Sequence, residues 1–131
     1  MIALDTNLLV RFVVNDGEQH ARAKRFIEAA LARRETLFIP QIVACEFVWV
    51  LRAAFKQSKA TSLDLLSQLL AVPSVRFEAD HQVRAAVERA ATSDAGFADC
   101  LICLRSREAG CTAFATFDQV LLKDDGAIEP T

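Results

Sequence analysis

The stretch that decides the fold is Met1-Ile2-Ala3-Leu4-Asp5-Thr6-Asn7, a short apolar run that ends on a carboxylate and two polar residues. Residues 2–4 predict a buried β-strand, and the polar residues that follow are typical of the start of a helix. Further short apolar runs predict strands at 36–40, 75–77 and 111–116, with a possible fifth at 127–128.

Amphipathic segments separate these strands. Apolar residues recur at helical spacing in two of them: Ala23, Phe26, Ile27, Ala30 and Leu31, and Val83, Ala86, Val87, Ala90 and Ala91. Helices are also predicted at 8–14, 41–55 and 97–109, and at a segment ending at Leu70 that Thr61 or Ser62 caps. Strands alternating with helices predict an α/β fold with a parallel sheet, in which ligands bind beyond the carboxyl ends of the strands.

Length and composition limit the class of protein. The chain has 131 residues, 53% hydrophobic and 24% charged, so we expect one globular domain over residues 1–131 and exclude disorder for most of it. No apolar run is long enough to span a membrane, and the first residues do not resemble a secretory signal. We therefore expect a cytoplasmic protein.

The four cysteines have apolar neighbours, and we interpret them as reduced core residues. Cys100 and Cys103 match the C-x-x-C spacing of redox pairs, and this redox role is the alternative to core packing. Cys45 and Cys111 have no such partner in sequence. A zinc site is disfavoured because the chain has no second C-x-x-C and its two histidines are distant in sequence.

Four acidic residues stand alone in otherwise uncharged segments: Asp5, Glu46, Asp99 and Asp118. An ionised carboxylate in apolar surroundings is costly unless it is paired, neutralised or bound to a metal. Asp5 and Asp118 each follow a predicted strand, so they meet at one edge of the sheet if the first and fourth strands are neighbours. Carboxylates gathered in one place suit Mg²⁺ or Mn²⁺, which can activate water and hold phosphate oxygens.

Each of these acids also has a purely structural interpretation. Asp5 can be a plain helix N-cap, and Asp118 can be a turn residue. Glu46 can form a buried ion pair with a distant arginine, and Asp99 can be an acid favoured by the helix dipole. The four acids together are more specific than any one of them.

The residues resemble those of a known family. Asp5-Thr6-Asn7 with Arg11, a lone Glu46 in an apolar helix, Asp99 in Gly-Phe-Ala-Asp, and Thr116-Phe-Asp118 together resemble the PIN domain, and above all the VapC-type ribonuclease toxins of bacterial toxin–antitoxin pairs. The resemblance extends over essentially the whole chain.

This resemblance implies a three-layer α/β/α fold with a short, mostly parallel four- or five-stranded sheet, in which the first strand lies beside the fourth. It implies Mg²⁺- or Mn²⁺-dependent hydrolysis of RNA, with Asp5, Asp99 and Asp118 as metal ligands and Glu46 as a ligand or as the residue that orients water. Thr6, Asn7 and Thr116 match supporting positions. A homodimer and an inhibiting antitoxin protein are the partners implied.

The chain is acidic overall but its charge is uneven. Residues 1–60 carry nine Lys/Arg and six Asp/Glu, whereas residues 61–131 carry six and eleven. Basic residues of the first half can face RNA phosphates or can simply form a solvated surface. These residues are Arg11, Arg22, Lys24, Arg25, Arg33, Arg34, Arg52, Lys56 and Lys59.

Two other functions remain open from the sequence. A receiver-type signalling module also uses acids and Mg²⁺ on a parallel sheet, but it needs a phospho-acceptor aspartate after the middle strand, and residues 75–78 offer none. A catalytically silent partner-binding protein is the other alternative. The apolar helix containing Phe47, Val48, Trp49 and Leu51 could then form an interface, although core burial is favoured.

Overall fold

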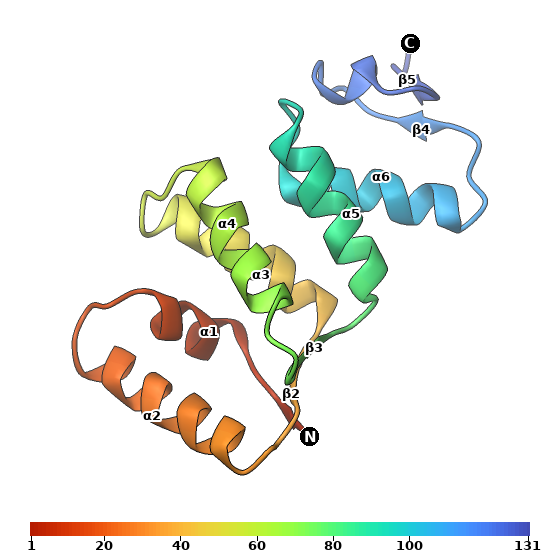
Figure 1. Ribbon diagram of the computed structural model, residues 1–131. Helices are drawn as coiled ribbons and strands as arrows, with labels where there is room; N and C mark the ends of the chain where they lie inside the picture. The colour runs from red at the N-terminus through yellow and green to blue at the C-terminus, as the bar shows by residue number, and fades with distance from the viewer. The chain divides into compact units, whose positions relative to one another are not determined.

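The computed structural model describes residues 1–131, which form two compact units, Met1–Asp80 and His81–Thr131 (Figure 1). The helices are α1 (Thr6–Val13), α2 (Glu18–Ala32), α3 (Gln41–Ala53), α4 (Lys59–Leu70), α5 (Asp80–Ala91), α6 (Phe97–Glu108) and the 3₁₀ turn η1 (Leu121–Lys123). The strands are β1 (Ile2–Ala3), β2 (Leu37–Ile39), β3 (Val75–Phe77), β4 (Phe114–Ala115) and β5 (Ala127–Ile128).

The first unit contains a three-stranded parallel sheet in the order β1-β2-β3. Ile2 is opposite Leu37, and Leu37 is in turn opposite Val75. Leu37 and Ile39 are fully buried, as expected for a central strand that helices cover. Because the three strands are parallel, their carboxyl ends lie at one edge of the sheet, and β1 and β2 lead from this edge directly into α1 and α3.

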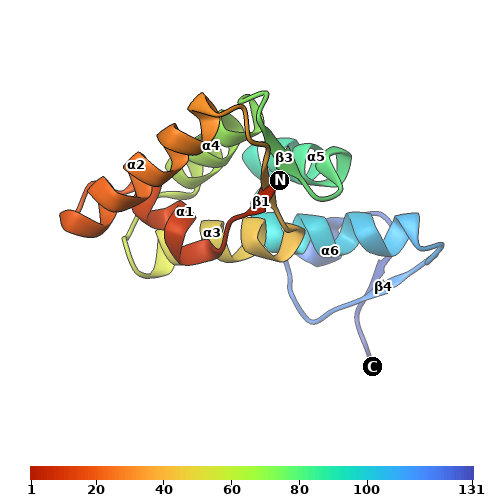
Figure 2. The same cartoon turned by 90° about the horizontal axis from the view of Figure 1, so that it is seen from below.

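Helices of the first unit bury their apolar faces against one another. α1 packs on α2 and α3, and α4 packs on α3 and β3 (Figure 2). The largest fully buried side chains at these contacts are Leu9, Phe47, Leu51 and Leu66. Truncation of a buried phenylalanine such as Phe47 to alanine typically costs about 3–5 kcal/mol. This core fixes the helices that begin at the carboxyl edge.

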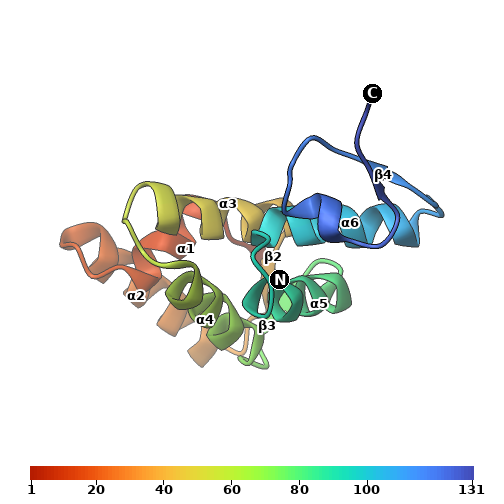
Figure 3. The same cartoon turned by 90° about the horizontal axis from the view of Figure 1, so that it is seen from above.

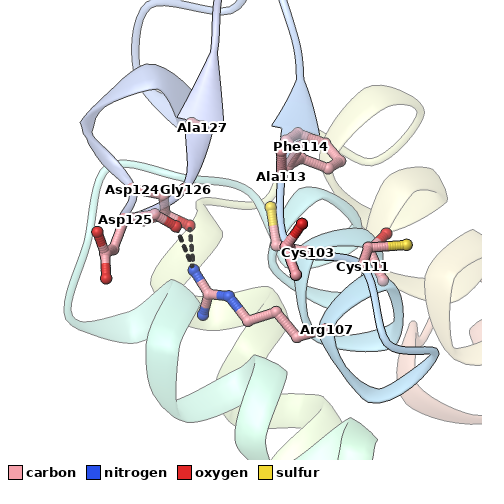
Figure 4. Close-up of a pocket in the computed structure, with 11 residues that line it drawn as sticks. Cys103, Arg107, Cys111, Ala113, Phe114, Asp124, Asp125, Gly126 and Ala127 are labelled. Carbon is pink, nitrogen blue, oxygen red and sulfur yellow. Dashed lines mark hydrogen bonds and ion pairs between the residues drawn. The ribbon is translucent and has the colours of Figure 1, made fainter.

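The second unit contains α5, α6 (Figure 3), η1 and a two-stranded parallel ribbon, β4-β5 (Figure 1). The Asp124 carboxylate pairs with Arg89 of α5. It also lies 3.7 Å from Nη2 of Arg107 on α6 (Figure 4). The same Arg107 nitrogen donates to the Asp125 carbonyl at 3.2 Å. These contacts fasten the turn before β5 to both helices of the unit.

The α/β class with parallel strands is confirmed, and every predicted helix and strand is present. The predicted strand 111–116 is wrong in length, because only Phe114 and Ala115 pair with a neighbouring strand. The predicted cap of α4 is also wrong: Ser58 accepts the Thr61 N–H at 3.0 Å. The five strands form one three-stranded sheet in the first unit and one two-stranded sheet in the second. The predicted pairing of the first strand with the fourth is between strands of different units, and it stays a prediction. No helix has the length and apolar character needed to cross a membrane.

Candidate active site

Asp5 lies between β1 and α1 and caps that helix. Its backbone is extended, with φ −89° and ψ 171°, and its Oδ1 accepts the N–H of Leu8 at 3.0 Å. Thr6 and Asn7 are the first two residues of α1. The capping interpretation of Asp5 is therefore confirmed. The carboxylate makes no further hydrogen bond or ion pair, which leaves Oδ2 available to a ligand.

Glu46 lies in the second turn of α3 and is exposed to solvent. The residues one turn before and after it on the same face, Ile42 and Trp49, are each 69% exposed. Two predictions about Glu46 are therefore wrong: that apolar residues surround its carboxylate, and that it forms a buried ion pair. The apolar segment that contains Glu46 is a helix with only one buried face. Burial is confirmed for Phe47, Val48 and Leu51 but not for Trp49.

Glu78 is an acidic residue at this edge that the sequence did not single out. It follows β3, and its Oε1 accepts the N–H of Gln41, the first residue of α3, at 2.9 Å. Pro40, the N-cap of α3, has no side-chain oxygen, so Glu78 supplies the missing acceptor from a neighbouring strand. Its position directly after a strand, like that of Asp5, was the signal available in the sequence.

Asp99 and Asp118 lie in the second unit and influence each other. Asp99 is in the first turn of α6 and is half-buried. Burial, followed by the charge of Asp118, raises the pKa of the Asp99 carboxyl above its ordinary value. Asp99 is thus the one candidate acid for which the predicted desolvation is observed, whereas Asp118 is exposed. An adjacent pair of repelling carboxylates is an arrangement that a divalent cation would stabilise.

Thr116 and Asp118 form a hydrogen-bonded turn after β4. The Thr116 Oγ1 accepts the Asp118 N–H at 3.0 Å. The supporting role of this threonine at the site stays a prediction. The Asp118 Oδ1 accepts the N–H groups of Val120 at 2.8 Å and Leu121 at 3.2 Å. The interpretation of Asp118 as a turn residue is confirmed, and its Oδ2 forms no further hydrogen bond.

The structure places two of the four candidate acids in each unit. Asp5 and Glu46 belong to the first unit, and Asp99 and Asp118 to the second. Within each unit taken by itself, no three histidine, cysteine or acidic side chains form a metal-binding group. The predicted meeting of all four carboxylates stays a prediction.

Other candidate groups have structural roles. The thiols of Cys100 and Cys103 are buried on α6, and burial raises the pKa of Cys103, whereas a redox-active cysteine needs a lowered pKa. Core packing is thus confirmed for these two, but Cys111 is exposed and its predicted burial is wrong. His20 contacts the carbonyl of Arg11 at 2.9 Å through Nδ1, and His81 is exposed.

A receiver-type signalling module needs a phospho-acceptor aspartate after the middle strand of its sheet. The middle strand of the first unit's sheet is β2, and Pro40 follows its last residue, Ile39. This strand therefore carries no phospho-acceptor aspartate.

Comparison with known proteins agrees with the predicted resemblance. The PIN domain family matches residues 2–125 of the chain. A VapC ribonuclease of Aquifex aeolicus (strain VF5) is 24% identical over 117 residues, a match that covers 89% of this chain and 87% of that protein. The family match over residues 2–125 includes all four candidate acids.

Proposed function

Because the chain belongs to the PIN domain family, we propose that it is a metal-dependent endoribonuclease that hydrolyses phosphodiester bonds in RNA. The similarity to a protein named VapC ribonuclease supports RNA as the substrate. The observation that carries the proposal is the carboxylate pair Asp99 and Asp118, in which one charge raises the pKa of the other.

The donor chemistry of the four acids fits Mg²⁺ or Mn²⁺. All four offer carboxylate oxygens, which hard divalent cations prefer, and no cysteine or histidine is among them. Burial and, after it, the charge of Asp118 raise the pKa of Asp99, and a bound cation would offset the repulsion between the two carboxylates. When bound, such an ion would lower the pKa of a water molecule and offset charge on the phosphate.

Each of the four acids has its own role in this proposal. Asp5 and Asp99 are the proposed principal ligands, and Asp118 ligates directly or through water. Glu46, which is exposed and has no ion-pair partner, is free to accept a proton from the attacking water or to ligate. Thr116 holds the Asp118 turn, and Thr6 and Asn7 belong to the helix start that Asp5 caps. We also propose that residues 1–131 form a single domain.

The same relative supports a proposal for the biological role. We propose that the protein is the toxin of a toxin–antitoxin pair, that a cognate antitoxin protein inhibits it, and that it acts in the cytoplasm as a homodimer. The similarity to the VapC ribonuclease supports the toxin role. The exposed side chains of Ile42 and Trp49 on α3 are compatible with burial in a protein interface.

The test is cleavage of RNA by the purified protein, free of antitoxin, with Mg²⁺ or Mn²⁺ and with chelator. We expect cleavage only with the metal. Asp5→Asn and Asp99→Asn should each abolish it while the circular dichroism spectrum stays unchanged. Ser58→Ala, which alters only the cap of α4, is the matched control and should cleave normally. Full activity in both aspartate variants would refute the site.

A further inference from the structure

A groove lies between the start of α1 and one face of α2, wholly within the first unit. Its lining includes Asp5, Asn7, Arg11, Arg22, Arg25 and Phe26. The lining therefore combines a proposed metal ligand with basic and aromatic side chains. Asp5, Arg22, Arg25 and Phe26 are all exposed to solvent.

The α2 wall presents its groups at helical spacing. Arg22, Arg25 and Phe26 are three and four residues apart, so they share one side of the helix. Phe26 belongs to the apolar stripe predicted from the sequence, yet it is 43% exposed, whereas Ala23 and Ile27 of the same stripe are buried. An aromatic ring that lines the groove beside two arginines and keeps this much exposure is available for stacking on a ligand.

The arginines differ in how free they are. Arg11 pairs with Asp16, and its guanidinium carbon lies 5.7 Å from the centre of the Phe55 ring, so its charge is engaged inside the protein. Arg22 and Arg25 form no ion pair or hydrogen bond. The uncompensated positive charge of the groove therefore comes from these two side chains.

We propose that this groove binds a single strand of RNA, with Arg22 and Arg25 on backbone phosphates and Phe26 stacked on a base. The inference rests on the proposed function and specifies how the substrate reaches the site. Free arginines and an exposed ring are the pair of features that single-strand binding uses. A strand held there passes Asp5, which brings a phosphodiester bond to a proposed metal ligand. A hydrophobic peptide would find only one large exposed apolar side chain in the lining.

Binding and cleavage can be measured separately. The probe is a fluorescently labelled, single-stranded RNA ten-mer in EDTA, with affinity followed by anisotropy between 0.05 and 1 M salt. Loss of two phosphate contacts should lower the slope of log K against log salt by about 1.4, which corresponds to about 25-fold weaker binding at 0.1 M salt. We expect this effect in the double variant Arg22→Gln/Arg25→Gln, and we expect it to fade towards 1 M salt.

Two control designs make the result specific. The variant Lys24→Gln/Arg33→Gln removes the same amount of charge from α2 and its C-cap, at residues that do not line the groove. Lys24 pairs with Glu28 instead. This variant should change the RNA affinity less than twofold. Phe26→Leu keeps an apolar side chain but removes the ring. It should weaken RNA binding at least about fivefold, because one base stack is lost. We expect the same effect in Phe26→Ala.

The outcomes separate this inference from the nuclease proposal. Equal RNA affinity in the groove and control double variants, or no RNA binding by the unaltered protein, would overturn the groove even if cleavage is confirmed. Weakened binding in the groove variants supports it even if the protein does not cleave. Groove variants that lose a co-purified antitoxin but bind RNA normally would assign the groove to a protein partner and overturn the proposal.

Discussion

Asp5 has a structural role and a proposed catalytic role, and two substitutions separate them. Its Oδ1 accepts the Leu8 N–H at 3.0 Å, so Asp5→Ala removes the N-cap of α1. Loss of such a cap costs about 1 kcal/mol. For a chain of this length that free energy corresponds to a fall in Tm of about 3–5 °C. Asp5→Asn keeps an acceptor that caps nearly as well, so its free energy of unfolding should fall by less than about 0.5 kcal/mol.

The effects of the two substitutions on cleavage should not follow this ranking of stability. Both variants lose a ligand oxygen, so both should lose metal-dependent RNA cleavage, although only Asp5→Ala is clearly destabilised. Urea denaturation and thermal melts measure the first property, and cleavage of a labelled RNA measures the second. Ser58→Ala removes the analogous cap of α4 and should lose about 1 kcal/mol with no change in cleavage. The reasoning is refuted if Asp5→Asn cleaves normally, or if it is destabilised as much as Asp5→Ala.

Three further substitutions test individual groups. Glu46→Gln should change the free energy of unfolding by less than about 0.5 kcal/mol, because the side chain is exposed and unpaired, yet it should lower the cleavage rate at least about 100-fold; normal cleavage would remove Glu46 from the mechanism. Asp99 has a raised pKa in the folded protein, so the protein loses stability as pH rises through that pKa. In EDTA, Asp99→Asn should therefore match the unaltered protein below pH about 3.8 and exceed it in stability at neutral pH; urea titrations that show no such divergence would contradict the desolvation of Asp99. Asp124→Ala removes the carboxylate between two arginines and should lower stability by about 1 kcal/mol, less at high salt; an effect independent of salt would show that the ion pairs are not its source.

The sequence predicted the order of elements well because local signals determine them. Helical spacing and capping residues act over a few positions, and every predicted helix is present. The errors occur where partners distant in the chain decide. The strand predicted at 111–116 is only two residues long, since pairing with β5 limits it. Ser62, predicted as a possible cap, lies inside α4 and donates to the Ser58 carbonyl at 2.8 Å.

The candidate acids show a different limit. A lone charge in an apolar segment was interpreted as a desolvated group, and this holds for Asp99 but not for Glu46. The overall hydrophobicity of a segment does not indicate which side of a helix faces the core. Glu46 lies on the exposed side of α3, together with Trp49. Similarly, no local pattern indicates that Glu78 accepts a hydrogen bond from the start of α3, because the two are 37 residues apart.

The structural and functional interpretations of the acids are compatible because a carboxylate has two oxygens. Asp118 uses Oδ1 to accept two backbone N–H groups, at 2.8 and 3.2 Å, and Asp5 uses Oδ1 to accept the N–H of Leu8 at 3.0 Å. These bonds hold each side chain in place and leave Oδ2 to a ligand. Asp118→Asn should therefore keep the turn through its amide oxygen, with a free energy of unfolding changed by less than about 0.5 kcal/mol, but it presents an N–H donor where a cation needs an acceptor. We expect metal-dependent cleavage to fall and to recover partly at higher Mn²⁺ concentration, as measured by a metal titration of the cleavage rate. A variant that cleaves normally at low metal concentration would show that the turn is the whole role of Asp118.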